Sequence, residues 1–128
     1  LHLHGELKKV RSSVDENLIY DCEGWELKMG DVCEKGSQLR PHVVWFGEAV
    51  PMMEEAASIS LQADLFLVVG TSLQVYLAAG LVQYTPSACP VYVVDPNKPA
   101  GNLDRPTTYI EEKASTGMQR MKSLLLEN

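Results

Sequence analysis

The feature that most constrains this chain is a pair of short segments that are apolar at every position and end in turn-forming residues. Residues 65–69 read LFLVV and run into Gly-Thr-Ser, and residues 91–94 read VYVV and run into Asp-Pro-Asn. A strand with no polar position has no face for water, so it must be buried on both sides, as the strands of parallel sheets are. The two segments therefore predict a parallel sheet that is covered by helices.

The sequence around these segments alternates between helical and extended patterns. Helices are predicted from apolar residues at helical spacing at residues 52–61, 77–84 and 116–127. Further strands of the same sheet are predicted at residues 42–46 and 107–110. An order in which strands and helices alternate indicates an α/β doubly wound fold with a mostly parallel sheet.

The last helix has the clearest signals. Thr116 with Gln119 three residues later is the pattern of a capping box, which predicts that the helix begins there. The apolar residues that recur at helical spacing and predict its inner face are Met118, Met121, Leu124 and Leu125.

Residues 8–40 interrupt the alternating pattern. They are polar, contain three glycines and show no sustained hydrophobic period. We therefore predict an inserted, irregular segment with little core of its own. A loop of this length is uncommon in a compact domain unless it has a function or some additional source of stability.

Charge, hydropathy and cysteine usage exclude several classes of partner. The net charge is −6 and no basic stripe is present, so nucleic acid is not expected as a partner. No apolar run approaches the ~20 residues that span a bilayer, so no membrane partner is expected either. The three cysteines are scattered and odd in number, which does not suit a disulfide framework and predicts a cytoplasmic protein.

Three of the predicted strands end in residues that could bind a ligand. In open α/β sheets, ligands bind beyond the carboxyl ends of the strands. The turn at residues 70–72 offers a glycine that lets a ligand approach and hydroxyl groups for a ribose or phosphate, but a plain turn and helix cap fits equally. Asp95 could accept hydrogen bonds from both hydroxyls of a ribose or form an Asp-Pro turn. The Gly-Glu pair at residues 47–48 could contact a ligand or form a plain turn.

Two histidines stand near the start of the chain. His2 and His4 flank Leu3, so on a strand both would share one face and could point into a cleft. An imidazole with a pKa near 6.5 is the natural general base at neutral pH, although most single histidines are structural or exposed. No second Cys, His or carboxylate stands at metal-binding spacing from either one.

Taken together, four motifs resemble the sirtuin family of NAD-dependent protein-lysine deacylases, and its bacterial members in particular. They are LHGEL at residues 3–7, LRPHVVWFGE at 39–48, VVGTSL at 68–73 and VYVVDPN at 91–97. Their order and spacing match the family and extend over nearly the whole chain. The resemblance implies that residues 1–128, which begin without a methionine, are the C-terminal part of a Rossmann-like catalytic domain, with the N-terminal half absent.

The resemblance also implies a reaction and the residues that perform it. NAD would be consumed as a co-substrate, the acyl group of a protein lysine would pass to ADP-ribose, and nicotinamide would be released. His4 would be the catalytic base. The residues implied to bind NAD are Gly70, Thr71, Ser72, Asp95, Pro96, Asn97 and Ala114. The residues implied to bind the acylated-lysine peptide are Val44, Trp45, Phe46, Gly47, Glu48, Val75 and Tyr76.

Two local departures from the family pattern bear on these roles. The family usually binds zinc through two Cys-x-x-Cys pairs, but here Ser12 and Gly36 stand at the outer ligand positions and only Cys22 and Cys33 remain. A structural zinc site needs four ligands, so no metal is expected. In addition, Leu77 stands where a proline is expected, which changes one side of the predicted substrate site.

A third departure concerns the whole chain. The strings of the family's phosphate loop and nicotinamide pocket do not occur in these 128 residues, so the isolated chain is expected to be inactive. The alternative is a non-catalytic module that binds adenosine or a peptide, or that self-associates. A sheet cut in half exposes an unpaired edge, which makes a homodimer of the fragment the expected assembly.

Overall fold

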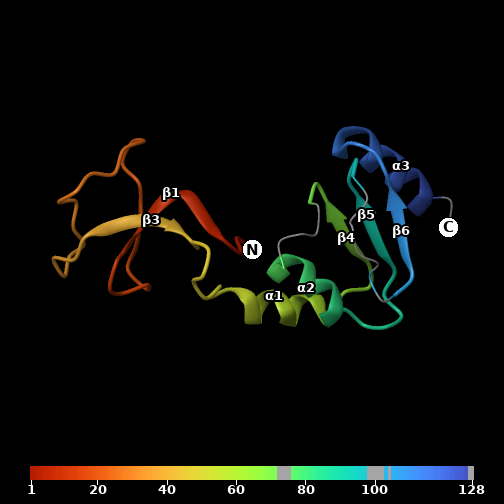
Figure 1. Cartoon of the computed structure of the whole chain (residues 1–128), viewed down its shortest axis with the longest axis horizontal. Helices are drawn as coiled ribbons and strands as arrows, with labels where there is room; N and C mark the ends of the chain where they lie inside the picture. The colour runs from red at the N-terminus through yellow and green to blue at the C-terminus, as the bar shows by residue number, and fades with distance from the viewer. Residues whose placement is uncertain (72–75, 98–102, 104, 127–128) are drawn as a thin grey trace. The chain divides into compact units, whose positions relative to one another are not determined.

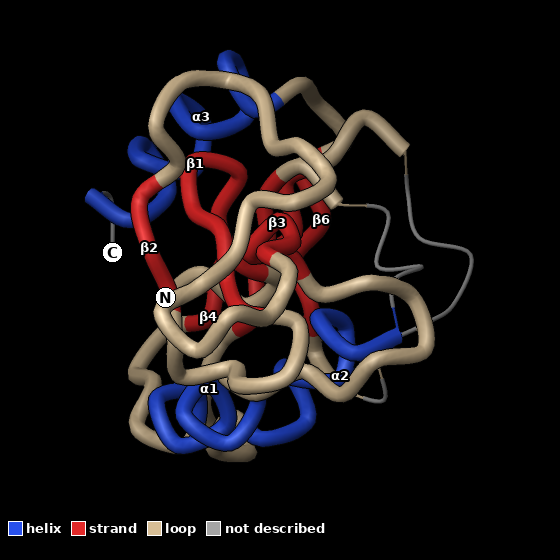
Figure 2. Tube along the Cα trace, turned by 90° about the vertical axis from the view of Figure 1, so that its left-hand side faces the viewer, coloured by secondary structure: helices blue, strands red, loops and turns tan. Residues whose placement is uncertain are grey.

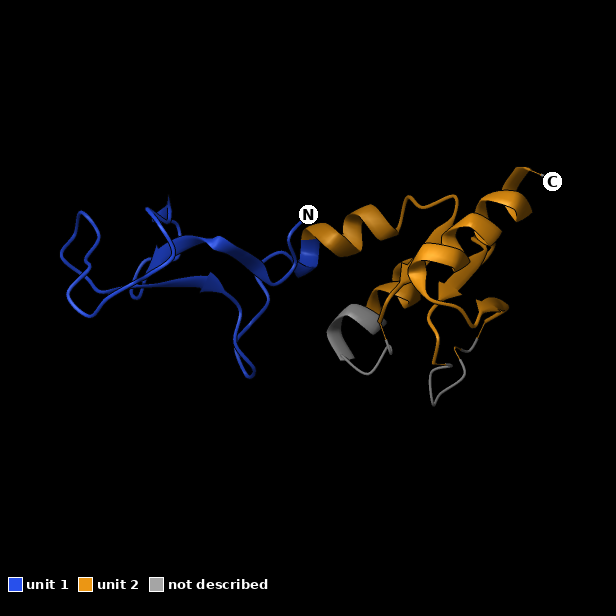
Figure 3. Ribbon diagram, turned by 90° about the horizontal axis from the view of Figure 1, so that it is seen from above, with its two compact units in different colours: residues 1–54 blue, residues 55–128 orange. Residues whose placement is uncertain are grey.

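The computed structural model describes residues 1–71, 76–97, 103 and 105–126. The chain divides into two compact units, Leu1–Glu54 and Glu55–Asn128, which are coloured separately in Figure 3. We call them the N-terminal unit and the C-terminal unit and describe each by itself.

The N-terminal unit is built on a three-stranded antiparallel sheet of order β2-β1-β3. Its strands are β1 (Gly5–Ser12), β2 (Ile19–Asp21) and β3 (Leu39–Val43). Figure 1 labels two of these strands, β1 and β3. The central strand pairs Val10 with Tyr20 on one side and Arg11 with Arg40 on the other. The sheet is therefore held by hydrogen bonds along both edges of β1.

This sheet corrects two predictions. Residues 8–40 are not irregular throughout, because much of β1, all of β2 and the start of β3 lie within them, whereas the connections at 13–18 and 22–38 contain no strand or helix. The strand predicted at residues 42–46 ends at Val43 and pairs with β1, so it is not part of the parallel sheet. The apolar alternation that would have revealed β1 is missing, because Arg11 and Ser12 are buried polar residues.

The long connection from β2 to β3 is organised by one side chain. The amide oxygen of Gln38 accepts the N–H of Gly30 at 2.8 Å, and its nitrogen donates to the carbonyl of Lys28 at 3.0 Å. The Asp31 carboxylate also accepts the N–H of Lys28 at 2.7 Å. These contacts tie residues 28–31 to Gln38 at the end of the connection.

The C-terminal unit contains the predicted parallel sheet, in the order β4-β5-β6. Its strands are β4 (Phe66–Val69), β5 (Val91–Val94) and β6 (Thr107–Ile110), and both pairs of neighbours run parallel. Its helices are α2 (Tyr76–Tyr84) and α3 (Ala114–Leu126), while α1 (Met53–Ser60) begins at the end of the N-terminal unit. None of the described helices is long and apolar enough to cross a membrane.

Both faces of the parallel sheet are covered. On one face Val68, Val91 and Val93 pack with Val82 of α2. On the other face Val94 and Ile110 pack with Met121 of α3, and Leu124 joins them. Alternate strand residues thus point to opposite layers, with α2 and α3 on opposite sides of the strands (Figure 2). The doubly wound α/β prediction is confirmed for this unit.

The start of α3 differs from the prediction, and its predicted inner face is confirmed only at Met121 and Leu124. The helix begins at Ala114, and its first turn is closed by the N–H of Gly117, which donates to the carbonyl of Lys113 at 2.8 Å. Thr116 is therefore inside the helix and is not its N-cap. The buried residues are Gly117 and Met121, whereas Met118 is 38% exposed and Leu125 45% exposed. The burial of Gly117 and Met121, four residues apart, determines which face of α3 is turned to the sheet. The predicted capping box does not form the start of the helix.

Candidate functional site

His4 lies in the turn that leads into β1, and its backbone is tied to the end of β3. Its carbonyl accepts the N–H of Val44 at 3.0 Å, and Gly5 pairs with Val43 in the sheet. The side chain of His4 is exposed. The expectation that His2 and His4 share one face of a strand is wrong, because β1 begins only at Gly5 and the ring of His2 instead contacts Glu6 at 3.6 Å.

The glycine after His4 is required by this close approach. Gly5 has a φ of 89°, a conformation that side chains with a Cβ rarely adopt. A Cβ at this position would also overlap the backbone carbonyl of His42. The His-Gly pair is therefore the sequence signature of a strand that starts against the backbone of its neighbour.

Residues 44–48, which we call the 44–48 turn, bring five of the predicted substrate residues together beside His4. The N–H of Glu48 donates to the carbonyl of Trp45 at 3.1 Å and closes the turn. Trp45 is 55% exposed and Phe46 is fully exposed, whereas Val44 is half-buried. The turn therefore exposes two aromatic side chains and the backbone of Gly47. These lie close in sequence to Val44, whose N–H holds the backbone of His4.

The Glu48 side chain points back into the unit and does not follow Trp45 and Phe46 outward. Its carboxylate accepts two hydrogen bonds from Arg40, at 2.6 and 3.0 Å, one from Arg11 at 3.4 Å and one from the N–H of Trp45 at 3.0 Å. The pKa of Glu48 is lowered to about 2, mainly by the hydrogen bonds from the Arg40 guanidinium. The hydrogen bond from the Trp45 N–H lowers this pKa further. Sequence reasoning missed Arg11 and Arg40, because only the strand register brings them to Glu48.

A small cavity lies in the same unit. It has a volume of about 210 Å³ and is lined in part by His2, Arg11, His42 and Val44. The Nδ1 atom of His42 is buried and has no hydrogen-bond partner. Burial, and next the charge of Arg11, lower the pKa of His42, so its neutral form is favoured.

The predicted NAD-binding residues belong to the C-terminal unit, where two lie at neighbouring strand ends. Gly70 follows β4 and donates its N–H to the carbonyl of Val94 at 3.0 Å. Asp95 follows β5, is 9% exposed and accepts the N–H of Asn97 at 2.8 Å. Asp95 thus forms the turn that was one of its two interpretations. The carboxyl ends of β4 and β5 therefore meet at one edge of the sheet.

The remaining predicted residues are placed less completely. Thr71 is half-buried beside Gly70, Pro96 and Asn97 are exposed, and Ala114 is the exposed first residue of α3. Tyr76 is the first residue of α2. Ser72 and Val75 lie outside the described residues.

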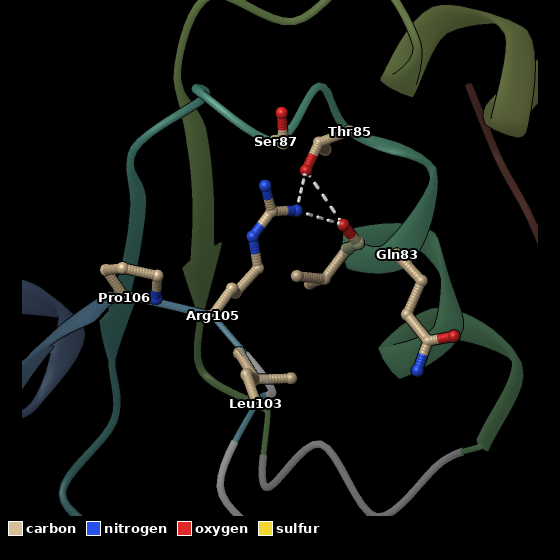
Figure 4. Close-up of a pocket in the computed structure, with 7 residues that line it drawn as sticks. Gln83, Thr85, Ser87, Leu103, Arg105 and Pro106 are labelled. Carbon is tan, nitrogen blue, oxygen red and sulfur yellow. Dashed lines mark hydrogen bonds between the residues drawn. The ribbon is translucent and has the colours of Figure 1, made fainter.

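A larger hollow lies at the other end of the parallel sheet. Its volume is about 610 Å³, and it surrounds Arg105, just before β6 (Figure 4). The Arg105 guanidinium donates to the carbonyls of Val82 at 2.7 Å and Pro86 at 2.6 Å and to the hydroxyl of Thr85. A cation at the carboxyl end of a helix is favourable, so Arg105 fixes α2 to the chain that enters β6. This hollow is distinct from the strand ends that carry Gly70 and Asp95.

The residues at the family's zinc positions do not fit a zinc ion. The hydroxyl of Ser12 accepts the N–H groups of Val14 and Asp15, both at 3.2 Å, and Asp15 pairs with Lys35 at 2.7 Å. Cys33 is buried; burial raises the pKa of its thiol, but hydrogen bonds, first from Ser12, outweigh this and lower it overall. In the described parts of the chain, which include all of residues 1–54, no group of three or more His, Cys, Asp or Glu side chains could hold a metal. An ion pair links the two turns where a metal would be expected.

Comparisons with known proteins agree with this architecture. The model of the Sir2 family matches residues 1–77. An NAD-dependent protein deacylase of Helicobacter pylori is 46% identical over 99% of this chain and 55% of its own length. A Sir2 homologue in complex with NAD superposes with a TM-score of 0.80 at 29% identity, over 98% of this chain and 50% of its own. Sir2Tm bound to a propionylated peptide gives a TM-score of 0.71 at 25% identity, over 94% of this chain and 54% of its own.

The relatives are longer than this chain. The chain spans about half the length of the curated relatives it matches. Within that span, the family model covers more than half of the chain, and the solved structures share the Rossmann-like arrangement of the parallel sheet. The chain belongs to the Sir2 family.

Proposed function

We propose that the full-length protein removes acyl groups from protein lysines with NAD as the co-substrate. The observation that carries this proposal is the hydrogen bond between the His4 carbonyl and the Val44 N–H, which holds a histidine beside the exposed 44–48 turn. The relatives named NAD-dependent protein deacylases and the Sir2 structures with NAD and with a propionylated peptide support it.

Each part of the chain has a role in the proposed reaction. NAD supplies the ribose carbon that the acyl oxygen attacks as nicotinamide leaves. His4 accepts a proton from a ribose hydroxyl, which suits an imidazole at neutral pH. The backbone of the 44–48 turn binds the peptide as an added strand, with Trp45 and Phe46 beside the acylated lysine.

The C-terminal unit has the complementary role of binding the co-substrate. Asp95 and Asn97 contact the adenosine ribose, Gly70 admits the ligand close to the backbone, and Ala114 contacts the adenine through its backbone. Their position beyond the carboxyl ends of parallel strands supports this assignment, because ligands bind there in folds of this class. The family resemblance also assigns Thr71 and Ser72 to NAD binding, and Val75 and Tyr76 to peptide binding.

Three further proposals accompany this function. No zinc is part of the protein, because Ser12 and Gly36 replace ligands and Asp15 is paired with Lys35. The protein works in the cytoplasm, which suits its free cysteines: Cys22, Cys33 and Cys89. It does not bind nucleic acid, given its net charge of −6.

A second candidate applies to the isolated 128-residue chain. It lacks the glycine loop that would anchor a pyrophosphate, so we expect it to be inactive and at most a binding or self-association module. The order β4-β5-β6 leaves β4 at an edge, and Val69 is 39% exposed, which favours pairing into a dimer. Light scattering at micromolar concentration tests this proposal, and a clean monomer contradicts it.

The test of the main proposal is a product measurement on the full-length protein. Acetyl-, propionyl- and succinyl-lysine peptides are incubated with NAD and followed by mass spectrometry. We expect loss of the acyl group from at least one peptide, with equimolar release of nicotinamide, and no turnover by the isolated chain. A folded full-length protein that binds NAD but releases no nicotinamide with any acylated peptide contradicts the proposal.

A further inference from the structure

The strand register of the N-terminal unit creates an electrostatic problem that one side chain resolves. Arg11 of β1 and Arg40 of β3 are direct partners across the antiparallel pair, and Arg11 is only 9% exposed. Like charges directly opposite each other destabilise a sheet, and a buried charge needs a partner. Glu48 is the carboxylate that both guanidinium groups contact, at 2.6 Å from Arg40 and 3.4 Å from Arg11.

The same carboxylate also determines the shape of the 44–48 turn. Glu48 accepts the N–H of Trp45 through its side chain at 3.0 Å and donates its own N–H to the Trp45 carbonyl at 3.1 Å. These reciprocal bonds fix both ends of the segment that contains Phe46 and Gly47. Because Arg40 also donates to the carbonyl of Val43 at 3.3 Å, the turn is anchored to the end of β3 as well.

The hydrogen-bonding capacity of Glu48 is largely used within the protein. Four hydrogen bonds converge on its two oxygens, and two of them form the parallel pair that a planar guanidinium makes with a carboxylate. Exposed ion pairs contribute little to stability, but bidentate pairs within a network hold a defined geometry. The arrangement is therefore suited to fixing a backbone conformation.

We infer that Glu48 is a positioning residue, which together with Arg40 and Arg11 holds the backbone of Trp45, Phe46 and Gly47 in the form that binds the peptide. This inference rests on the proposed function and changes one part of it. The Glu48 side chain does not contact the substrate, and the peptide meets only the backbone and the aromatic side chains of the turn. Removing the carboxylate charge therefore weakens peptide binding and leaves the chemical step unchanged.

The experiment compares Glu48→Gln with the control Lys35→Gln in the full-length protein. The control removes an ion pair of the same unit, Lys35 with Asp15 at 2.7 Å, that has no contact with the turn. For Glu48→Gln we expect the KM of the acylated peptide to rise roughly tenfold or more, while kcat and the KM of NAD stay within about twofold. The control should change none of the three. A wild-type peptide KM in folded Glu48→Gln, or a fall in kcat at unchanged KM, overturns the inference.

Two further variants keep the test decisive if Glu48→Gln does not fold. Glu48→Asp keeps the charge but is one methylene shorter, and Arg40→Lys keeps the charge but loses the fork. Both should raise the peptide KM above that of the wild type, with kcat unchanged. Where Glu48→Gln folds, the increase should be smaller than in that variant. A folded pair of variants with wild-type peptide KM contradicts a positioning role.

Peptide binding separates this inference from the proposed function. In a Trp25→Phe background, Trp45 is the only tryptophan of this chain, and an acyl-lysine peptide is titrated against its emission. If the protein releases no nicotinamide but binds the peptide, and Glu48→Gln weakens that binding, the proposed function fails and the inference stands. If the peptide binds equally to both forms, or to neither, the inference fails.

Discussion

The two units of this chain are stabilised by different interactions. The N-terminal unit buries the apolar side chains of Val10 and Cys33, and all but one of the ion pairs among the described residues lie in it. The C-terminal unit buries two apolar clusters, one on each face of its parallel sheet. The first unit is held by hydrogen bonds and charge pairs, and the second by hydrophobic packing.

Under the proposed function, the two units also hold different kinds of site residue. His4 and the 44–48 turn of the N-terminal unit would have to be held in defined backbone conformations, which directional contacts such as those of Glu48 can do. In the C-terminal unit, Gly70 and Asp95 need only extend from the ends of rigid strands. Hydrophobic packing supplies that rigidity, because protein cores are close-packed.

The largest effect on stability is expected in the C-terminal unit. Met121→Ala removes a side chain that is 1% exposed and leaves a cavity between α3 and the sheet, which should cost about 2–5 kcal/mol. Met118→Ala in the same helix is the control, because Met118 is 38% exposed and should change the free energy of unfolding by no more than about 0.5 kcal/mol. Urea denaturation measures both. Equal effects would show that α3 does not pack through Met121.

The largest effect on activity is expected in the N-terminal unit. His4→Ala in the full-length protein should lower turnover at least ~100-fold, the usual contribution of a positioned base. His2→Ala should leave turnover nearly unchanged, because the His2 side chain is exposed and its ring pairs with Glu6. The measurement is the rate of nicotinamide release. Near wild-type turnover in His4→Ala would remove the catalytic assignment of His4.

A smaller loss of stability should follow from changing the backbone contact behind His4. Gly5→Ala imposes an unfavourable φ and an overlap with the carbonyl of His42. Backbone strain alone typically costs about 1–3 kcal/mol, so we expect the free energy of unfolding to fall by more than that. Gly24→Ala isolates the strain, because Gly24 has a φ of 94° but no atom within 4 Å of an added Cβ. Thermal denaturation compares the two variants, and a smaller loss for Gly5→Ala contradicts the close approach.

Acid should weaken the N-terminal unit through two groups. The pKa of Glu48 falls from its usual 4.5 to about 2 on folding, so its contribution is complete above pH 4.5 and is lost as the pH falls through about 2. The pKa of His42 is lowered from 6.5 by burial and Arg11, so protonation opposes folding as the pH falls below 6.5. Hydrogen exchange of the β1 amides should therefore lose protection in acid sooner than that of the β5 amides. Parallel loss in both strands would contradict the comparison.

The difference between hydrophobic and polar stabilisation also explains which strands could be predicted from the sequence. The apolar runs at residues 65–69 and 91–94 match β4, which begins one residue later at Phe66, and β5, because a strand buried on both faces leaves a wholly apolar run. The strand at residues 107–110 also matches β6, although its two threonines make it less apolar. The strand β1 was missed, because its buried residues include Arg11 and Ser12 and no apolar alternation marks it. Hydrophobic patterns report hydrophobic packing, and a sheet held by polar contacts leaves no such pattern.

The candidate site was predictable to a similar extent. Motifs predicted the 44–48 turn and the ends of β4 and β5 as candidate site segments, because each of the three is a single continuous stretch of sequence. The contacts of Glu48 were not predictable, because Arg11 reaches it only through the pairing of β1 with β3, and Arg40 reaches it only through the turn that follows β3. The role of a side chain in such a network depends on strand register, which a single sequence does not specify.

We propose that hydrogen bonds and ion pairs hold the N-terminal unit together without a metal. The most direct test measures the metal content and the melting curve of the full-length protein with and without a strong chelator. We expect no stoichiometric zinc and an unchanged melting temperature, because Ser12, Asp15 and Cys33 do not form a ligand set and Lys35 occupies Asp15. Stoichiometric zinc, with loss of the N-terminal unit's structure when the chelator removes it, would contradict the claim.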